Sequence, residues 1–183
     1  MTRKTIVELI AGVAASFPDN SVGAITPLLL RTFLNNFLDT MRPSYGAASL
    51  TSLTVGLTAT DAGFAWGTVV AAQAPDYTVA LATGIITRAG GPASATVQFS
   101  IDVVSPNNTI TVFTLYIDGV ATPWAVSNTS TNTSDVQSYA MSALNYSANA
   151  NPTYQIRART NGVNTVTLSN GVVVVQNVPV NTN

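Results

Sequence analysis

The side chains of this sequence that could perform acid–base chemistry are few, and beyond residue 50 the carboxylates are all aspartates. They are Asp61, Asp76, Asp102, Asp118 and Asp135. Hydrolysis by paired carboxyl groups needs two of them within reach of one bond, and no motif points to such a pair. Asp118 belongs to a turn, Asp135 ends a polar loop, and Asp102 is expected on the outward face of a strand. We therefore predict structural roles for Asp118 and Asp135, and a glycosidase using two of the five stays open as an alternative.

Other catalytic and metal chemistries are restricted by the residue types that the chain lacks. It has no histidine and no cysteine, which excludes Ser-His-Asp and thiol catalysis and metal sites built on imidazole or thiolate. Asp135 and its Asn and Ser neighbours could bind Ca²⁺, but no loop has the spacing of an EF-hand. We predict no catalytic residue, no cofactor and no metal ligand, and hence a protein that is not an enzyme.

The charge content of the chain is low. Only 8% of the residues are charged, against roughly 25% in an average globular protein, and 46% are hydrophobic. With no basic patch, nucleic acid is not expected as a partner, and no apolar run reaches the ~18 residues of a membrane span. So little charge favours a protein that buries part of its surface against other copies of itself.

Two helices are predicted at the start of the chain, joined by a turn over residues 17–23. The first, over residues 5–16, opens with the capping-box pattern Thr5-Ile6-Val7-Glu8. The same region has the apolar character of a signal peptide, although Glu8 in its middle argues against that alternative. The second runs over residues 27–41, with Thr26 as its N-cap and Pro27 at its first position. Its apolar side chains cover more than one stripe, so we expect residues 1–42 to form a helical hairpin that lies in an interface.

After a linker over residues 43–50, the pattern changes to the period of two that is typical of strands. In residues 96–103, for example, Val97, Phe99, Ile101 and Val103 alternate with polar residues. Roughly ten such strands with regular turn signals indicate an antiparallel sandwich or jelly roll over residues 51–183. Asp118-Gly119 and Asn170-Gly171 are each predicted to form a hairpin turn. The fold class is therefore mainly β, with an N-terminal helical hairpin.

The helical region resembles the N-terminal segment of bacteriophage virion proteins of the tail-fibre type. These share a first helix followed by the pattern F-x-D-N-x-x-G-x-I-x-x-x-x-L-R-x-x-L-x-D. The matching residues of this chain are Phe17, Asp19, Asn20, Gly23, Ile25, Leu30, Arg31, Leu34 and, shifted by one position, Asp39. The match covers about a fifth of the chain. It implies a structural protein of the virion, assembled in the host cytoplasm and docked on other virion proteins of tail or head.

Residues 95–178 resemble a TNF/C1q-type jelly roll, a trimeric module that often ends phage fibres and head spikes. The resemblance rests on the segments TVQFSIDVV, FTLYIDGV, VQSYAMSALNYSANANPTYQIRART and NTVTLSNGVVVVQNV. The motif L-x-x-G-D expected before the second-last hairpin is absent, and Leu144 with residues 145–152 stands in its place. The resemblance implies a homotrimer with apolar strands around a threefold axis.

The expected function is thus that of a non-enzymatic homotrimeric short fibre, spike or decoration protein. The residues expected to dock or oligomerise are Phe17, Asp19, Asn20, Ile25, Leu30, Arg31, Phe33, Leu34, Phe37, Leu38 and Met41. A first alternative is a receptor-binding, lectin-like module for host-surface glycan or protein, in which Trp124 and Tyr146, both next to turns, would face the ligand. A second alternative is a depolymerase, ranked below the first because the carboxylates are unpaired.

Overall fold

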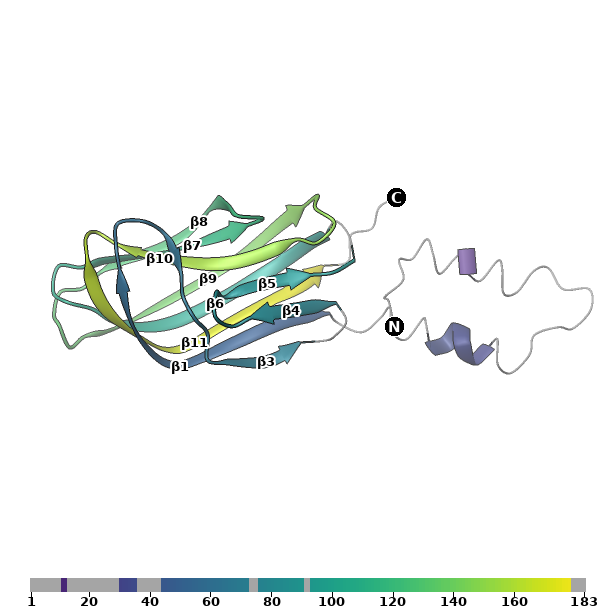
Figure 1. Ribbon diagram of the computed structural model, residues 1–183, viewed down its shortest axis with the longest axis horizontal. Helices are drawn as coiled ribbons and strands as arrows, with labels where there is room; N and C mark the ends of the chain where they lie inside the picture. The colour runs from purple at the N-terminus through teal and green to yellow at the C-terminus, as the bar shows by residue number, and fades with distance from the viewer. Residues whose placement is uncertain (1–10, 13–29, 36–43, 73–75, 91–92, 179–183) are drawn as a thin grey trace, which may run out of the picture. The chain divides into compact units, whose positions relative to one another are not determined.

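The chain divides into two compact units, residues 1–43 and residues 44–183. A computed structural model describes residues 11–12, 30–35, 44–72, 76–90 and 93–178 (Figure 1). In the first unit, residues 11–12 and residues 30–35 are helical, and each segment falls within one of the two predicted helices. The remainder of the predicted hairpin lies outside the described residues.

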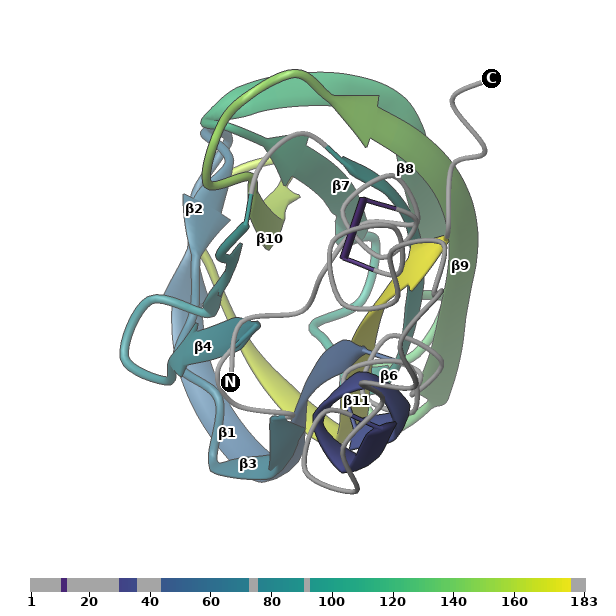
Figure 2. The same ribbon diagram turned by 90° about the vertical axis from the view of Figure 1, so that its right-hand side faces the viewer.

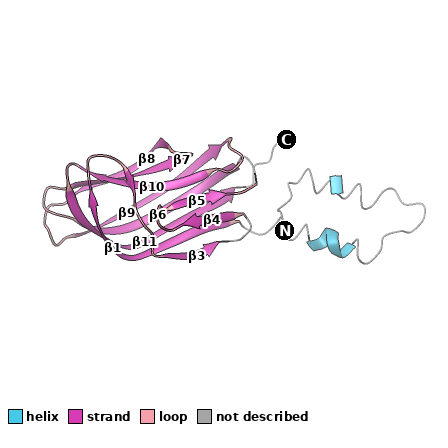
Figure 3. Ribbon diagram, viewed as in Figure 1, coloured by secondary structure: helices cyan, strands magenta, loops and turns pink. Residues whose placement is uncertain are grey.

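The second unit consists almost entirely of strands in its described part (Figure 3). Their bounds are β1 (Tyr45–Leu57), β2 (Ala62–Gly63), β3 (Thr68–Ala72), β4 (Tyr77–Ala80), β5 (Ile85–Arg88), β6 (Ala93–Val104), β7 (Ile110–Ile117), β8 (Val120–Thr129), β9 (Val136–Ser147), β10 (Thr153–Thr160) and β11 (Asn164–Val178). The mainly β class predicted from the period-two pattern is confirmed.

These strands form two antiparallel sheets that face each other (Figure 2). Sheet A has the strand order β3-β1-β11-β6-β9, and sheet B has the order β4-β5-β10-β7-β8 with the short β2 paired to β10. Chain neighbours such as β10 and β11 lie in different sheets, while the first and last strands pair directly over almost their full length. This arrangement is a jelly-roll sandwich, as the sequence predicts.

The core lies between the sheets and follows the predicted alternation. Val97, Phe99, Ile101 and Val103 of β6 are buried, with at most 3% of their surface exposed. The middle of the core is a cluster of aromatic rings. Its ring pairs have centroids 5.0–6.4 Å apart, and the cluster consists of Phe64, Trp66, Phe99, Phe113 and Tyr139. Such tilted and edge-to-face pairs add about 0.5–1.5 kcal/mol each beyond their buried area, so this cluster helps to hold the two sheets together.

The predicted hairpin at Asn170-Gly171 is wrong, because β11 continues through these residues as one strand. Ser169 is paired with Asp102 and Val172 with Ser100, so both Asn170 and Gly171 stand opposite the single residue between them. This is a β-bulge, in which Asn170 has a left-handed backbone with a φ of 50°. An Asn-Gly pair satisfies the backbone of a bulge as well as that of a turn. Here the pairing of β11 with strands on both of its sides favours the bulge.

Two further boundaries differ from the sequence-based expectation. Residues 45–50, which were expected to form a linker, are the first half of β1, where the small side chains of Ala47 and Ala48 and that of Leu50 are buried. The predicted loop over residues 127–134 begins later, because β8 extends to Thr129. The turn at Asp118-Gly119 is confirmed, since Ile117 pairs with Val120 and both turn residues have a positive φ.

Candidate functional site

The carboxylates of the second unit are dispersed, and most of them accept hydrogen bonds from neutral groups nearby. Asp76 accepts a hydrogen bond of 2.8 Å from the Ser44 hydroxyl, and Asp135 accepts one of 3.4 Å from Thr131. Within the described residues, no group of three or more acidic side chains has an arrangement that could hold a metal ion. Their environments are those of structural carboxylates.

Asp118 joins the ends of three strands. Its carboxylate accepts hydrogen bonds from the Ser147 hydroxyl at the end of β9, at 2.5 Å, and from the backbone N–H of Thr153 at the start of β10, at 2.8 Å. Partial burial raises the pKa of Asp118, but these hydrogen bonds outweigh that effect, so the pKa lies below its ordinary value. The side chain therefore fixes the β7–β8 turn onto the neighbouring strands.

Asp102 has the same kind of environment on the outward side of β6. The Ser138 hydroxyl donates to one carboxylate oxygen at 2.6 Å, and the Asn170 side-chain amide donates to the other at 2.9 Å. These hydrogen bonds lower the pKa of Asp102. Asp102 thus links β6 to β9 and to the bulge of β11.

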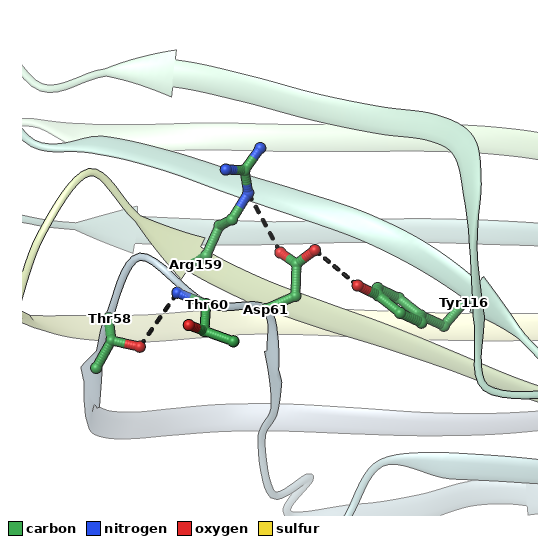
Figure 4. A network of polar contacts seen from close by, with 5 residues as sticks. All are labelled: Thr58, Thr60, Asp61, Tyr116 and Arg159. Atoms are coloured by element: carbon green, nitrogen blue, oxygen red, sulfur yellow. Dashed lines mark hydrogen bonds and ion pairs between the residues drawn. The ribbon is translucent and has the colours of Figure 1, made fainter.

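The fifth carboxylate, Asp61, differs because it contacts an arginine on the outward side of sheet B. It lies on the segment between β1 and β2, and one of its oxygens accepts a hydrogen bond of 2.8 Å from the hydroxyl of Tyr116 on β7 (Figure 4). Its other oxygen lies 3.3 Å from Nε of Arg159 on β10. The hydrogen bond to Asp61 is the main cause that raises the pKa of Tyr116 above its ordinary value.

Arg157 completes this group, two residues before Arg159 on the same strand. Its guanidinium carbon lies 4.1 Å from the centroid of the Tyr116 ring, and its Nε donates a hydrogen bond of 2.7 Å to the side-chain oxygen of Gln155. We call Asp61, Tyr116, Arg157 and Arg159 the arginine cluster. It contains two cations and one carboxylate, so its net charge is positive.

The two aromatic residues predicted to face a ligand are both exposed, and they belong to different sheets. Trp124 is 42% exposed on β8 of sheet B, and Tyr146 is 63% exposed on β9 of sheet A. The aromatic residues Trp66, Tyr139 and Tyr154 are instead buried in the core.

Of the eleven residues predicted to dock or oligomerise, four are described: Leu30, Arg31, Phe33 and Leu34. Leu30 and Leu34 are 44% and 46% exposed on one turn of helix, and Arg31 is exposed as well. The other seven, Phe17, Asp19, Asn20, Ile25, Phe37, Leu38 and Met41, lie outside the described residues. No helix within the described part of the chain is long and apolar enough to cross a membrane.

A further surface of note is the outward side of sheet A, which has almost no charge. We define the outer face of sheet A as the residues of β6, β9 and β11 that alternate with the core residues. They are Thr96, Gln98, Ser100, Asp102, Ser138, Ala140, Ser142, Leu144, Tyr146, Thr165, Thr167, Ser169, Val172, Val174 and Gln176. Asp102 is the one charged residue among them. Leu144 and Tyr146, both more than 60% exposed, lie near the end of β9, the edge strand of the sheet.

Sequence reasoning did not identify the arginine cluster. Arg157 and Arg159 lie on the outward side of β10, but Asp61 and Tyr116 are distant in sequence and are brought beside β10 by the jelly-roll topology. The one available signal was the spacing of the two arginines, which puts both on the same face of a strand.

Comparison with known proteins supports the fold. No family model matches the chain. No curated protein sequence matches it either. Among solved structures, the chain is similar to Eiger TNF from S. frugiperda, with a TM-score of 0.55 and 14% sequence identity over 75% of this chain and 94% of that one. At this identity the similarity shows the fold alone, which is a TNF-like jelly roll.

Proposed function

We propose that the chain is a non-enzymatic structural protein of a bacteriophage virion. It is a homotrimeric short fibre, spike or decoration protein, attached to tail or head through its N-terminal helices. The observation that carries the assembly part of this proposal is the outer face of sheet A, which is broad, nearly uncharged and bordered by exposed apolar side chains.

Burying this face costs little desolvation free energy. Its polar groups are mostly small hydroxyls, and burial of a charge would cost far more than burial of a hydroxyl that finds a partner. The single charge, on Asp102, already accepts hydrogen bonds from Ser138 and Asn170. A stable contact between proteins removes about 800 Å² per partner from water, so the proposed contact would use much more of the sheet than Leu144 and Tyr146 alone.

The placement of the apolar residues favours a ring of subunits. Leu144 and Tyr146 lie on the edge strand β9, whereas Val172 and Val174 lie on the central strand β11. If the edge of one subunit packs on the middle of its neighbour's sheet, the contact joins two different patches. Such a heterologous contact closes into a ring when the rotation allows it, and it also covers the free edge of β9, which is otherwise open to unwanted strand pairing.

The virion part of the proposal is supported by the N-terminal sequence pattern and by the exposure of Leu30 and Leu34 on their helix. Exposed leucines one helical turn apart form an apolar stripe suited to a partner surface. In this proposal residues 1–42 attach the protein to the particle, and the β-sandwich projects from it. Subnanometre imaging of intact particles tests this arrangement, and density with threefold symmetry for the sandwich is the expected result.

The trimer is tested in solution with the variant Leu144→Asp. Light scattering of the unchanged chain should give three times the monomer mass, and the variant should give a monomer that is still folded, because Leu144 does not contribute to the core. Val163→Asp is the control, since Val163 is 87% exposed in the loop between β10 and β11. A monomeric unchanged chain, or loss of the trimer in the control alone, would refute the proposed contact.

A receptor-binding module is the second candidate, favoured by the 42% exposure of the Trp124 side chain on the other sheet. Tryptophan rings stack on sugars and anchor protein contacts. Purified protein that competes with particles for adsorption to host cells, and loses this ability in Trp124→Ala, would support this candidate. Equal competition by the variant would argue against a role for Trp124.

A further inference from the structure

The arginine cluster concentrates positive charge in a unit that otherwise has little of it. Residues 44–183 contain three arginines and no lysine, and two of the three are Arg157 and Arg159. Since side chains two residues apart on a strand share a face, both point outward from sheet B. Within the described part of the chain, Asp61 is the one carboxylate that contacts either of them, so one positive charge is left over.

Both guanidinium groups are held in place through one side only. Arg157 is fixed by its Nε hydrogen bond to Gln155 and by its position over the Tyr116 ring. Gln155 is itself held by a hydrogen bond of 2.7 Å to the Thr83 carbonyl. Arg159 contacts Asp61 through Nε at 3.3 Å, and its two terminal nitrogens lie on the far side of the guanidinium from that carboxylate (Figure 4).

The terminal nitrogens of Arg157 and Arg159 make no hydrogen bond or ion pair to any described residue. Arginine side chains normally lose considerable conformational entropy on binding, and groups held in advance lose less. Two immobilised guanidiniums with free N–H groups on one face are suited to an oxyanion with two or more oxygens, which arginine binds in a bidentate manner.

The rest of the face indicates what could carry such an oxyanion. β10 is paired on both sides, to β7 and to β5 and β2, so no free strand edge is available for the backbone of a peptide. The net charge of the cluster suits a single anionic group, whereas nucleic acid requires many basic contacts. The exposed residues Thr58 and Thr60 precede Asp61 on the same segment, where the Thr58 hydroxyl accepts a hydrogen bond from the Thr60 N–H (Figure 4). Their hydroxyl groups could hydrogen-bond to sugar hydroxyls.

We propose that Arg157 and Arg159, with Tyr116 and Asp61, form a binding site for the carboxylate or phosphate group of an acidic saccharide. The arginines bind the oxyanion, and Tyr116 positions Arg157 beneath it. Asp61 positions Arg159, but its carboxylate also competes with the ligand for the positive charge of the Arg159 guanidinium. The site does not depend on the proposed trimer, because it lies on sheet B while the proposed subunit contact uses sheet A.

Because Asp61 competes with the ligand, removing its charge should strengthen binding of the oxyanion. Asp61→Asn removes the negative charge and keeps an oxygen that can accept the Tyr116 hydrogen bond. If the cluster binds an oxyanion, this variant should bind it several times more tightly than the unchanged chain. If the cluster only stabilises the fold, the same change weakens an ion pair and improves no binding.

The experiment is a titration of the full chain with glucuronate, glucose 6-phosphate and uncharged glucose, followed by NMR through the Nε–Hε signals of the arginines. We expect both acidic sugars to shift the signals of Arg157 and Arg159, at concentrations up to about 50 mM, and glucose to leave them unchanged. A stronger response to glucuronate assigns the site to carboxylate sugars, and a stronger response to the phosphate ester assigns it to phosphorylated ones.

Single variants connect the binding to the cluster. Arg157→Gln and Arg159→Gln should each raise the dissociation constant about tenfold, as expected for loss of a charged bidentate contact. Ala150→Asp is the control, because it lowers the net charge by the same unit in the exposed loop before β10, and it should change the constant by less than about twofold. The unfolding midpoint of each variant shows whether it remains folded.

Three results would overturn the site. The first is the absence of any shift with either acidic sugar, and the second is an equal response to glucose. The third is equal weakening in Ala150→Asp, which would show an effect of overall charge. A short acidic peptide that binds more tightly than both sugars would overturn the saccharide assignment.

Discussion

At the scale of single residues, the aspartates of the second unit have two kinds of environment. Asp76, Asp102, Asp118 and Asp135 accept hydrogen bonds from neutral hydroxyl or N–H donors, whereas Asp61 is set against cations. A carboxylate that accepts such bonds keeps its charge without a buried ion pair, which would carry a larger desolvation cost. The first group therefore stabilises turns and strand ends, whereas the arginine cluster carries the net positive charge that the proposed oxyanion site uses.

Asp118 should make stability depend on pH in the acid range. Its pKa is lower in the folded protein than its ordinary value of 3.8, so the folded state binds the proton more weakly than the unfolded chain. The resulting stabilisation is complete above that ordinary value and is lost as the pH falls through the folded pKa. Asp118→Asn should lower the free energy of unfolding at pH 7 by about 1–2 kcal/mol, and asparagine tolerates the positive φ at this position. Urea unfolding from pH 7 to pH 2.5 should show this difference shrinking with pH, and a constant difference would contradict it.

Two glycines of β1 should respond to alanine in opposite directions. A Cβ at Gly46 would lie 2.9 Å from Cγ2 of Ile86 and 3.0 Å from the Tyr77 ring, while a Cβ at Gly56 would meet no atom within 4 Å. Gly46→Ala should therefore cost about 1–3 kcal/mol through overpacking. Gly56→Ala should be neutral or stabilise by up to about 1 kcal/mol, because alanine restricts the unfolded chain. Chemical denaturation of the two variants checks this, and equal midpoints would show that the core beside Gly46 adapts.

At the scale of elements, the strands could be predicted where one face is buried, because alternation marks that face directly. The inward residues of β6, β7 and β10 follow this rule. The bulge in β11 could not be predicted, since Asn-Gly supplies the same left-handed backbone to a hairpin and to a bulge. Which one forms depends on the distant strands β1 and β6, which pair with β11 on its two sides. The arginine cluster could not be predicted either, because Tyr116 comes from β7 and Asp61 from the segment after β1.

Asn170 contributes to the bulge of β11 in two ways, through a side-chain hydrogen bond and through its left-handed backbone, and two substitutions should separate these contributions. This side chain donates to Asp102 at 2.9 Å, and its residue has a φ of 50°. Asn170→Gly loses the hydrogen bond, which costs about 1 kcal/mol, but keeps a residue that adopts a positive φ without strain. Asn170→Ala also places an ordinary residue in the left-handed region, at roughly 1–2 kcal/mol more. Thermal and urea unfolding should thus rank alanine below glycine. The reverse order would mean that the bulge relaxes to another register.

At the scale of the whole molecule, the low charge content agrees with the proposed contact between copies of the chain. Among the described residues, the 24 buried members of the hydrophobic core all lie between Ala48 and Val175, within the second unit. Asp102 is the one charged residue of the outer face of sheet A, and further charge there would obstruct the proposed assembly. In the proposed protein, attachment to the particle and association between subunits are therefore tasks of different parts of the chain.

This division of tasks predicts the behaviour of a fragment that contains residues 44–183. Because the described residues of the hydrophobic core all lie within it, the fragment should fold with the same near-ultraviolet dichroism as the full chain. It should also remain a trimer in light scattering, because the proposed subunit contact uses sheet A, and it should fail to incorporate into particles that accept the full chain. Leu144→Asp in the fragment serves as the control and should give a monomer. A folded but monomeric fragment, next to a trimeric full chain, would instead transfer the subunit contact from sheet A to the helices of residues 1–43.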